Sequence, residues 1–173
     1  METRSVYLTG SFKDLKSAER AYNLLKDRGY KDDEINIIMS EDSMKRYFKD
    51  DSNKETKFGN KAKEGAGAGA TVGGVVGAAA GIIAAIGTSV LIPGLGIVIA
   101  GPIAAGLAGA GAGGITGGIV GALVGAGMPK ERATKYEQGI KEGEIVLAVD
   151  VRNEDDALFF ENEWQNYGHN VYR

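Results

Sequence analysis

The sequence predicts an α+β protein in which a ferredoxin-like (split βαβ) head is interrupted by a glycine-zipper α-helical hairpin. Residues 65–129 contain no Asp, Glu, Lys or Arg, whereas all 20 basic and 23 acidic residues lie on either side of that stretch. Within the uncharged stretch, glycine recurs at every fourth position in two runs, one on each side of a Pro-Gly pair. Each charged flank carries a strand–helix–strand pattern, and joining the two flanks gives the order of a split βαβ fold.

Residues 1–40 form the first half of the predicted head. Apolar and other side chains alternate over residues 5–12, which predicts a half-buried strand. A helix follows, with Asp14 or Ser17 as its N-terminal cap, apolar residues at helical spacing as far as Leu25, and Gly29 as its stop. An Ile-rich run at 34–40 supplies the second strand. Residues 41–64 then form a short helix and a polar lead-in to the uncharged stretch.

Residues 129–173 form a connecting helix and the second half of the head. Pro129 suits the first position of a helix, and residues 130–142 place Ala133, Tyr136 and Ile140 on one side of it. Residues 144–151 predict a strongly apolar strand, Asn153 the cap of another helix, and residues 169–173 a short final strand. The predicted sheet has four antiparallel strands with two helices on one face.

Residues 65–128 form the predicted hairpin, which would serve as a membrane segment or as the core of an oligomer. We assign its turn to Pro93, Gly94 and Gly96. The two halves of the head can pair only if the insert returns to its starting point, and a helical hairpin does so. The glycines assigned to helix packing and oligomerisation are Gly65, Gly69, Gly73, Gly77, Gly81, Gly109, Gly113, Gly117, Gly121 and Gly125.

These glycine rows need a physical reason, because each glycine inside a helix costs about 1 kcal/mol relative to alanine. Rows of small residues let two helix backbones approach closely, which favours packing in an apolar medium. As helices, residues 65–92 and 102–127 would be roughly 42 and 39 Å long, against about 30 Å for a bilayer core. The most apolar part, however, is the tip at 89–102, where a crossing hairpin needs polar residues.

Four arrangements therefore stay open for the insert. The hairpin crosses the membrane, or it dips in without crossing. Alternatively, hairpin tips from several copies bury one another, or the helices form a core enclosed by protein. Because the insert has no ionisable group, proton transport of the kind found in rotary ATPase rings is absent, and a passive pore stays as an alternative.

Composition excludes several classes of function. A net charge of −3 offers no basic field for nucleic acid. There is no Cys and the only His is His169, so thiolate metal sites, Cys nucleophiles and His clusters are excluded. No nucleophile–base pair is visible either, and we expect neither an enzyme nor a cofactor.

Two weaker patterns have simpler interpretations than a binding site. The GxGxxG match at Gly109, Gly111 and Gly114 follows no strand, so we attribute it to chance in a glycine-rich stretch. The acidic runs at 32–34 and 154–156 are interpreted as a solvated turn and a helix start rather than as a cation site.

Three aromatic residues lie close in sequence to the two ends of the insert: Tyr47, Phe48 and Tyr136. One interpretation is that they pack the head onto the insert. The other is that they anchor the protein in a lipid headgroup layer, where amphipathic aromatic rings gather. They are therefore candidate interface anchors.

As a whole, the chain resembles the bacterial general stress protein (heat-induced stress protein) family, whose members carry a glycine-zipper insert. The resemblance covers nearly the whole chain. It implies a stress-linked, membrane-associated protein and supplies no catalytic residues. It rests on the segments IIMS at 37–40, RYF at 46–48, IPGLG at 92–96, AGP at 100–102 and GMP at 127–129, followed by Ala133, YE at 136–137, GI at 139–140 and LAV at 147–149.

We therefore expect a non-enzymatic stress-response protein that self-associates through its glycine zippers and attaches to or inserts in the membrane. Its expected partners are further copies of itself and membrane lipid. The N-terminus lacks the apolar segment of a secretory signal and lysines flank the insert, so the head is expected in the cytoplasm at the membrane face. A fully cytoplasmic protein is the alternative. Other candidate functions are a soluble homo-oligomer with a buried hairpin bundle, a small-molecule-sensing ferredoxin-like module, and a passive pore.

Overall fold

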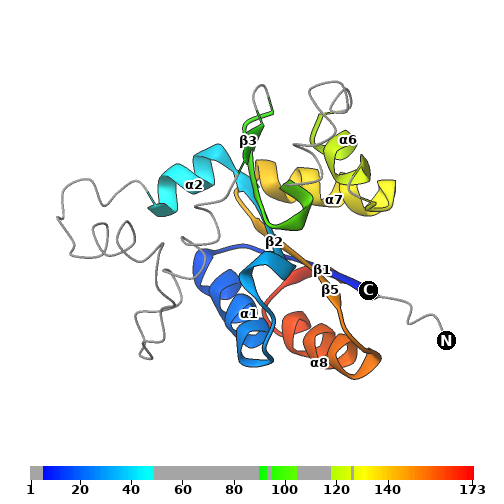
Figure 1. The fold of residues 1–173 in the computed structure, drawn as a ribbon. Coiled ribbons are helices and arrows are strands. Elements are labelled where there is room, and N and C mark those ends of the chain that lie inside the picture. Colours follow the sequence, from blue (N-terminus) through cyan, green and yellow to red (C-terminus); the bar gives the residue numbers. More distant parts are fainter. Residues whose placement is uncertain (1–5, 49–89, 93–94, 105–117, 126) are drawn as a thin grey trace.

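The computed structural model of the chain describes residues 6–48, 90–92, 95–104, 118–125 and 127–173. In this part, six strands form one sheet in the order β3-β4-β2-β5-β1-β6, and every neighbouring pair is antiparallel (Figure 1). The strands are β1 (Val6–Phe12), β2 (Ile35–Ser40), β3 (Val90–Ile92), β4 (Ile97–Ala100), β5 (Ile145–Val151) and β6 (His169–Tyr172).

Helices cover both faces of the sheet. Helices α1 and α8 pack on one face, and α6 and α7 lie on the other (Figure 1). The sheet therefore forms the middle of three layers. The helices are α1 (Leu15–Asp27), α2 (Glu41–Phe48), α6 (Gly118–Gly125), α7 (Lys130–Lys141) and α8 (Glu154–Gln165), with a short 3-10 helix η1 (Asp32–Glu34) before β2.

The structure confirms the α+β class and the order of strands and helices expected in the two flanks. The expected caps are also present. Asp14 Oδ1 accepts a hydrogen bond from Ser17 N at 2.8 Å, and Asn153 Oδ1 accepts one from Asp156 N at 2.8 Å. Each cap satisfies a backbone N–H that has no partner inside the first turn of its helix.

The expectation of a helix as far as residue 92 is wrong at its end, because residues 90–92 form the strand β3, which pairs with β4. The run 97–100 is rich in β-branched residues, which pack well on a pleated sheet, and it pairs with the free edge of β2. The register places Ile38 opposite Ile99 and Met39 opposite Val98. Pro93 and Gly94 lie outside the described residues, while Gly96 is in the connecting turn with φ +62°.

The described parts of residues 65–128 pack against the head. Ile97 and Ile99 are fully buried, and they share a second hydrophobic core with residues of β2, β5 and α7. Ile119 and Leu123 of α6 join the same core. The apolar residues at 97–99, expected near the hairpin tip, are therefore enclosed by protein. The remaining residues of the insert lie outside the described part.

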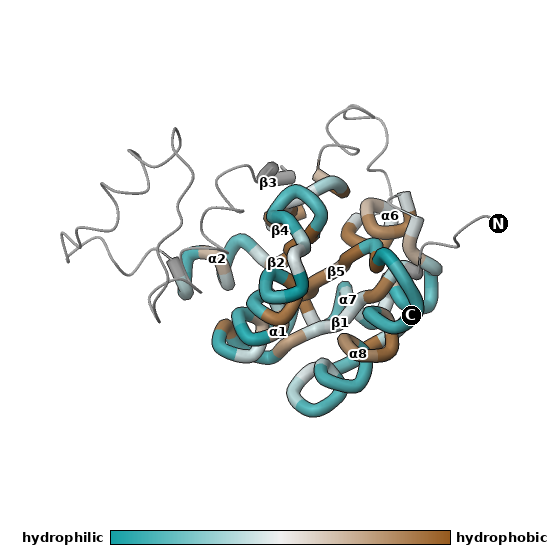
Figure 2. The backbone as a smooth tube through the Cα atoms, turned by 60° about the horizontal axis from the view of Figure 1, so that its bottom comes forward, coloured by the Kyte–Doolittle hydropathy of each residue, from teal (hydrophilic) through white to brown (hydrophobic). Residues whose placement is uncertain are grey.

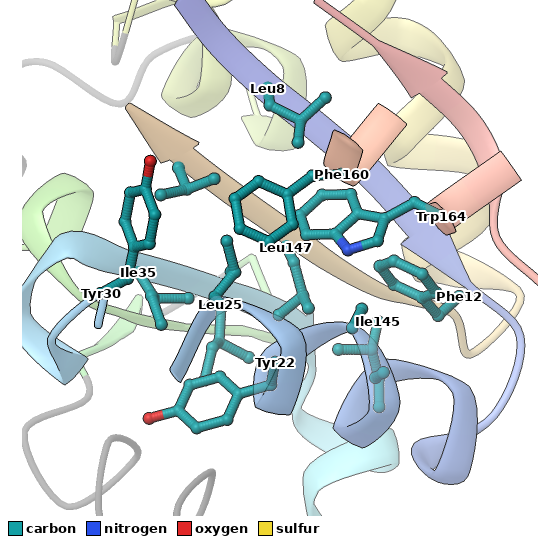
Figure 3. Packing of buried hydrophobic residues seen from close by; sticks show 14 of the residues in the cluster. Leu8, Phe12, Tyr22, Leu25, Tyr30, Ile35, Ile145, Leu147, Phe160 and Trp164 are labelled. Carbon is teal, nitrogen blue, oxygen red and sulfur yellow. The ribbon is translucent and has the colours of Figure 1, made fainter. Parts of the chain in front are cut away.

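The first core fills the space between the sheet and the pair α1 and α8 (Figure 3). Its aromatic side chains meet edge to face, with ring centroids 5.5 Å apart for Phe12 and Trp164 and 5.6 Å apart for Tyr30 and Phe160. The nearby Asp156 carboxylate accepts hydrogen bonds from Arg28 at 2.6 Å and Tyr30 at 2.9 Å. This carboxylate is compensated within the fold, so its role is structural.

The side chain of Asn36 joins the insert to the centre of the sheet through hydrogen bonds. Its side chain is 3% exposed, and Nδ2 donates to Ala148 O at 3.1 Å in β5. Its Oδ1 accepts a hydrogen bond from Ile103 N at 2.7 Å, just after β4. The chain reaches this position through Gly101, whose φ is +95° and whose backbone lies against that of Ile35 and Asn36. One buried carboxamide thus links β2, β5 and the insert.

We predict that Gly101→Ala lowers the free energy of unfolding by about 2–5 kcal/mol, as measured by urea denaturation. A Cβ there would overlap the Ile35 carbonyl oxygen and lie 2.9 Å from the Asn36 Cα, in addition to the strain of a positive φ. Gly96→Ala is the matched control, because its φ is also positive and nothing lies within 4 Å of the added Cβ. It should lose only about 1–2 kcal/mol. Equal losses for the two variants would contradict the close approach at Gly101.

Candidate functional site

Helix α6 presents an apolar face that no described residue covers. Its inward side carries Ile119, Ala122 and Leu123, which are at most 4% exposed. Its outward side carries Gly121, Val124 and Gly125, with Val124 41% exposed. The helix has no polar side chain, and Figure 2 shows α6 largely in the colours of hydrophobic residues. A helix that is apolar on all sides is normally buried on all sides.

Two of the ten predicted packing glycines lie on this outward side. A Cβ added at Gly121 or Gly125 would meet nothing within 4 Å among the described residues. The sequence pattern therefore identifies a row of small residues that is open in the described structure. The other eight glycines lie outside the described part, so their close packing stays a prediction: Gly65, Gly69, Gly73, Gly77, Gly81, Gly109, Gly113 and Gly117.

The candidate aromatic anchors do not gather at one surface. Tyr136 is fully buried in the second core, and its hydroxyl lies 2.7 Å from both Thr9 Oγ1 and Asn170 O. Burial raises the pKa of Tyr136 above the ordinary tyrosine value. Its role is therefore packing, and anchoring in lipid is wrong for this residue. Tyr47 is half-buried against the first core, and the Phe48 side chain lies outside the described residues.

A cleft of about 330 Å³ lies next to α6 and was not predicted from the sequence. Segments far apart in the chain form it: the start of α2, the β3–β4 turn, α6 and the end of α7. Its lining residues are Ser40, Asp42, Ser43, Arg46, Leu95, Gly96, Ile97, Ile119, Ile140, Lys141, Glu142 and Gly143.

The serine hydroxyls of the cleft are engaged in holding its wall together. Ser40 Oγ donates to Ser43 Oγ at 2.9 Å and accepts a hydrogen bond from Ser43 N at 3.0 Å, which caps α2. Ser43 Oγ in turn donates to Gly143 O at 3.2 Å, just after α7. These bonds join the start of α2 to the end of α7 and so fix two sides of the cleft.

The charged residues of the cleft differ in whether their side chains contact other polar side chains. Lys141 Nζ lies 2.8 Å from Glu137 Oε1, and Gln138 Nε2 donates to Glu142 Oε1 at 3.0 Å. By contrast, Asp42 and Arg46 are exposed, and neither side chain forms an ion pair or hydrogen bond with another described residue. The cleft therefore offers one carboxylate and one guanidinium to a ligand, beside an apolar wall.

The remaining polar residues singled out from the sequence form ion pairs within the fold or lie exposed on its surface. Two of the three η1 acids form ion pairs: Asp32 with Lys26 at 2.8 Å and Glu34 with Arg152 at 2.7 Å. His169 is exposed at the start of β6. Among the described residues, no three His, Cys, Asp or Glu side chains are grouped so that they could hold a metal ion. Within the same residues, no helix combines the length and the apolarity needed to cross a membrane.

Comparison of the chain with protein-family models, curated proteins and solved structures finds no match.

We predict that Gly121→Ala raises the free energy of unfolding by about 0.5–1 kcal/mol in dilute solution. Alanine is the better helix former, and the space beside Gly121 is open in the described structure. Gly168→Ala is the opposite control, because its Cβ would lie 2.8 Å from Trp164 O and 2.9 Å from a ring carbon of Phe12. That variant should be destabilised. Loss of stability in Gly121→Ala would mean that another segment occupies the space beside α6.

Proposed function

We propose that the protein is a non-enzymatic assembly module that self-associates through the glycine-rich outward face of α6 and the neighbouring glycine rows. The observation that carries this proposal is the character of α6. It is apolar on every side, yet the described residues cover only the side of Ile119, Ala122 and Leu123. An uncovered apolar helix face favours association with another apolar surface.

The chemistry of the face favours a second copy of the same helix as its occupant. Gly121 and Gly125 are spaced by four residues on α6, so they lie on one line along the helix. Two such lines can cross with their backbones in contact, and the gain is in dispersion and weak Cα–H···O contacts. A contact between identical faces closes on itself as a two-fold dimer. Val124 beside the row would add apolar area to that contact.

The remainder of the chain would present this assembly surface on a rigid support. We propose that β2-β5-β1-β6 with α1 and α8 forms a ferredoxin-like unit, which is supported by the strand order and by two helices on one face. The stress-linked role is proposed from the resemblance to the general stress protein family alone. No catalytic role is assigned to any residue.

We predict that Gly121→Leu reduces the mass of the assembly in sedimentation velocity without unfolding the protein. The added side chain keeps two backbones apart, while the open space beside Gly121 leaves room for it within one copy. Thr134→Leu is the matched control, since it adds a leucine on the exposed side of α7. If Gly121→Leu retains the wild-type mass, the α6 face is not the contact.

A membrane surface is the second candidate partner. It is favoured by the absence of charge over residues 65–129 and by the lysines that precede the stretch at 54, 57, 61 and 63. Lipid would then cover apolar segments of the insert, with the head at the cytoplasmic face. Because residues 97–99 are buried in the second core, any lipid contact would involve other parts of the insert.

Fractionation of cells without detergent distinguishes a membrane partner from further copies of the protein. If lipid is the partner, the protein pellets with membranes and resists extraction by alkaline carbonate. If other copies are the partner, we expect a monodisperse particle of two or more copies in the supernatant. A monomer in the supernatant would contradict both proposals.

A further inference from the structure

We infer that the cleft beside α6 binds a small aliphatic zwitterion, in which an ammonium and a carboxylate group share one short apolar body. Free aliphatic amino acids have this chemistry. The inference is independent of self-association, because it rests on different side chains. Its basis is the position of Asp42 and Arg46 in the cleft lining next to an apolar wall, where neither side chain forms an ion pair with another described residue.

The two charges have the spacing of a helical ion pair but do not form one. Asp42 and Arg46 are four residues apart on α2, where opposite charges normally lie within reach of each other. The neighbouring pair Glu41 and Lys45, with the same spacing on the same helix, does form a salt bridge. Asp42 and Arg46 instead line the cleft, and neither forms a hydrogen bond or salt bridge with another described residue, although Asp42 lies within the field of Lys45. Among the described residues, no ion pair therefore competes with a ligand for either group.

Because the cleft lining carries one negative and one positive side chain, a zwitterion fits it better than a simple anion or cation. A carboxylate bound to Arg46 would experience repulsion from Asp42, and an ammonium bound to Asp42 would experience repulsion from Arg46. A ligand that carries both groups satisfies both side chains at once. The other charged lining residues, Lys141 and Glu142, already have partners on α7 and add little net charge.

The shape and the wall of the cleft indicate the rest of the ligand. A volume of about 330 Å³ is at the small end of the range for ligand sites. The wall is aliphatic, with no aromatic side chain in the lining, which favours a branched aliphatic body. Its apolar members are Leu95, Ile97, Ile119 and Ile140.

The test is calorimetric titration of the full chain with L-leucine and with two analogues that each lack one charge. 4-Methylpentanoate lacks the ammonium group, and 3-methylbutylamine lacks the carboxylate. We expect saturable binding of leucine and roughly fivefold weaker binding of each analogue, since exposed ion pairs contribute up to about a factor of five. Failure of leucine to bind at millimolar concentration would overturn the inference. Equal or tighter binding of 4-methylpentanoate would overturn the zwitterion and assign a simple anion instead.

Two variants assign the charges to residues. Arg46→Gln should abolish the difference between leucine and 3-methylbutylamine, whereas Asp42→Asn should abolish the difference between leucine and 4-methylpentanoate. Lys16→Gln is the matched control, because Lys16 is an exposed lysine of α1, which packs on the other face of the sheet, and its loss should leave leucine binding unchanged. Both test positions are exposed, and far-ultraviolet circular dichroism checks that each variant is folded. Leucine binding that neither variant alters would place the site elsewhere and overturn the inference.

Discussion

The buried carboxamide of Asn36 is the constraint on which the arrangement of the insert depends. It occupies the middle of the sheet, where a polar group without a partner costs about 1–3 kcal/mol. Both ends of the amide are satisfied, one by β5 and the other by Ile103 N. The second bond requires the chain after β4 to turn through Gly101 at close range. That turn directs Ile103 and Ala104 into the second core, where they pack with α6 and α7.

The strands and helices of the two flanks could be predicted because each depends on residues that lie close together in the sequence. Alternation marked β1, helical spacing marked α1 and α8, and the caps Asp14 and Asn153 act within a single turn. The insert is different. The run 97–100 was expected in the tip between two helices, because the glycine rows on either side favoured helices there, and a short apolar run does not identify a strand by periodicity alone. What decides its structure is the unpaired edge of β2, which lies about 60 residues earlier in the chain and is a tertiary feature.

The candidate site could be predicted only in part for similar reasons. The glycine spacing singled out Gly121 and Gly125, but whether they point inward depends on which side of α6 the second core takes. Tyr136 was ambiguous between core and surface because a tyrosine suits both, and its bonds to β1 and β6 decide for the core. The cleft has no sequence signature, since four separate segments meet there. The spacing of Asp42 and Arg46 was visible, but the absence of a bond between them is a property of the folded chain.

The place of β5 between β1 and β2 has a consequence for biosynthesis. The two strands made first are not neighbours in the sheet, so they cannot pair when they leave the ribosome. β1 has both of its partners, β5 and β6, after the whole uncharged stretch, whereas β2 can pair earlier with β4. Contacts between such distant segments form slowly, because a long loop must close before they are made. The glycine-rich stretch therefore leaves the ribosome before β1 has a partner, and its first encounter with a chaperone, a membrane or another nascent copy precedes the native fold.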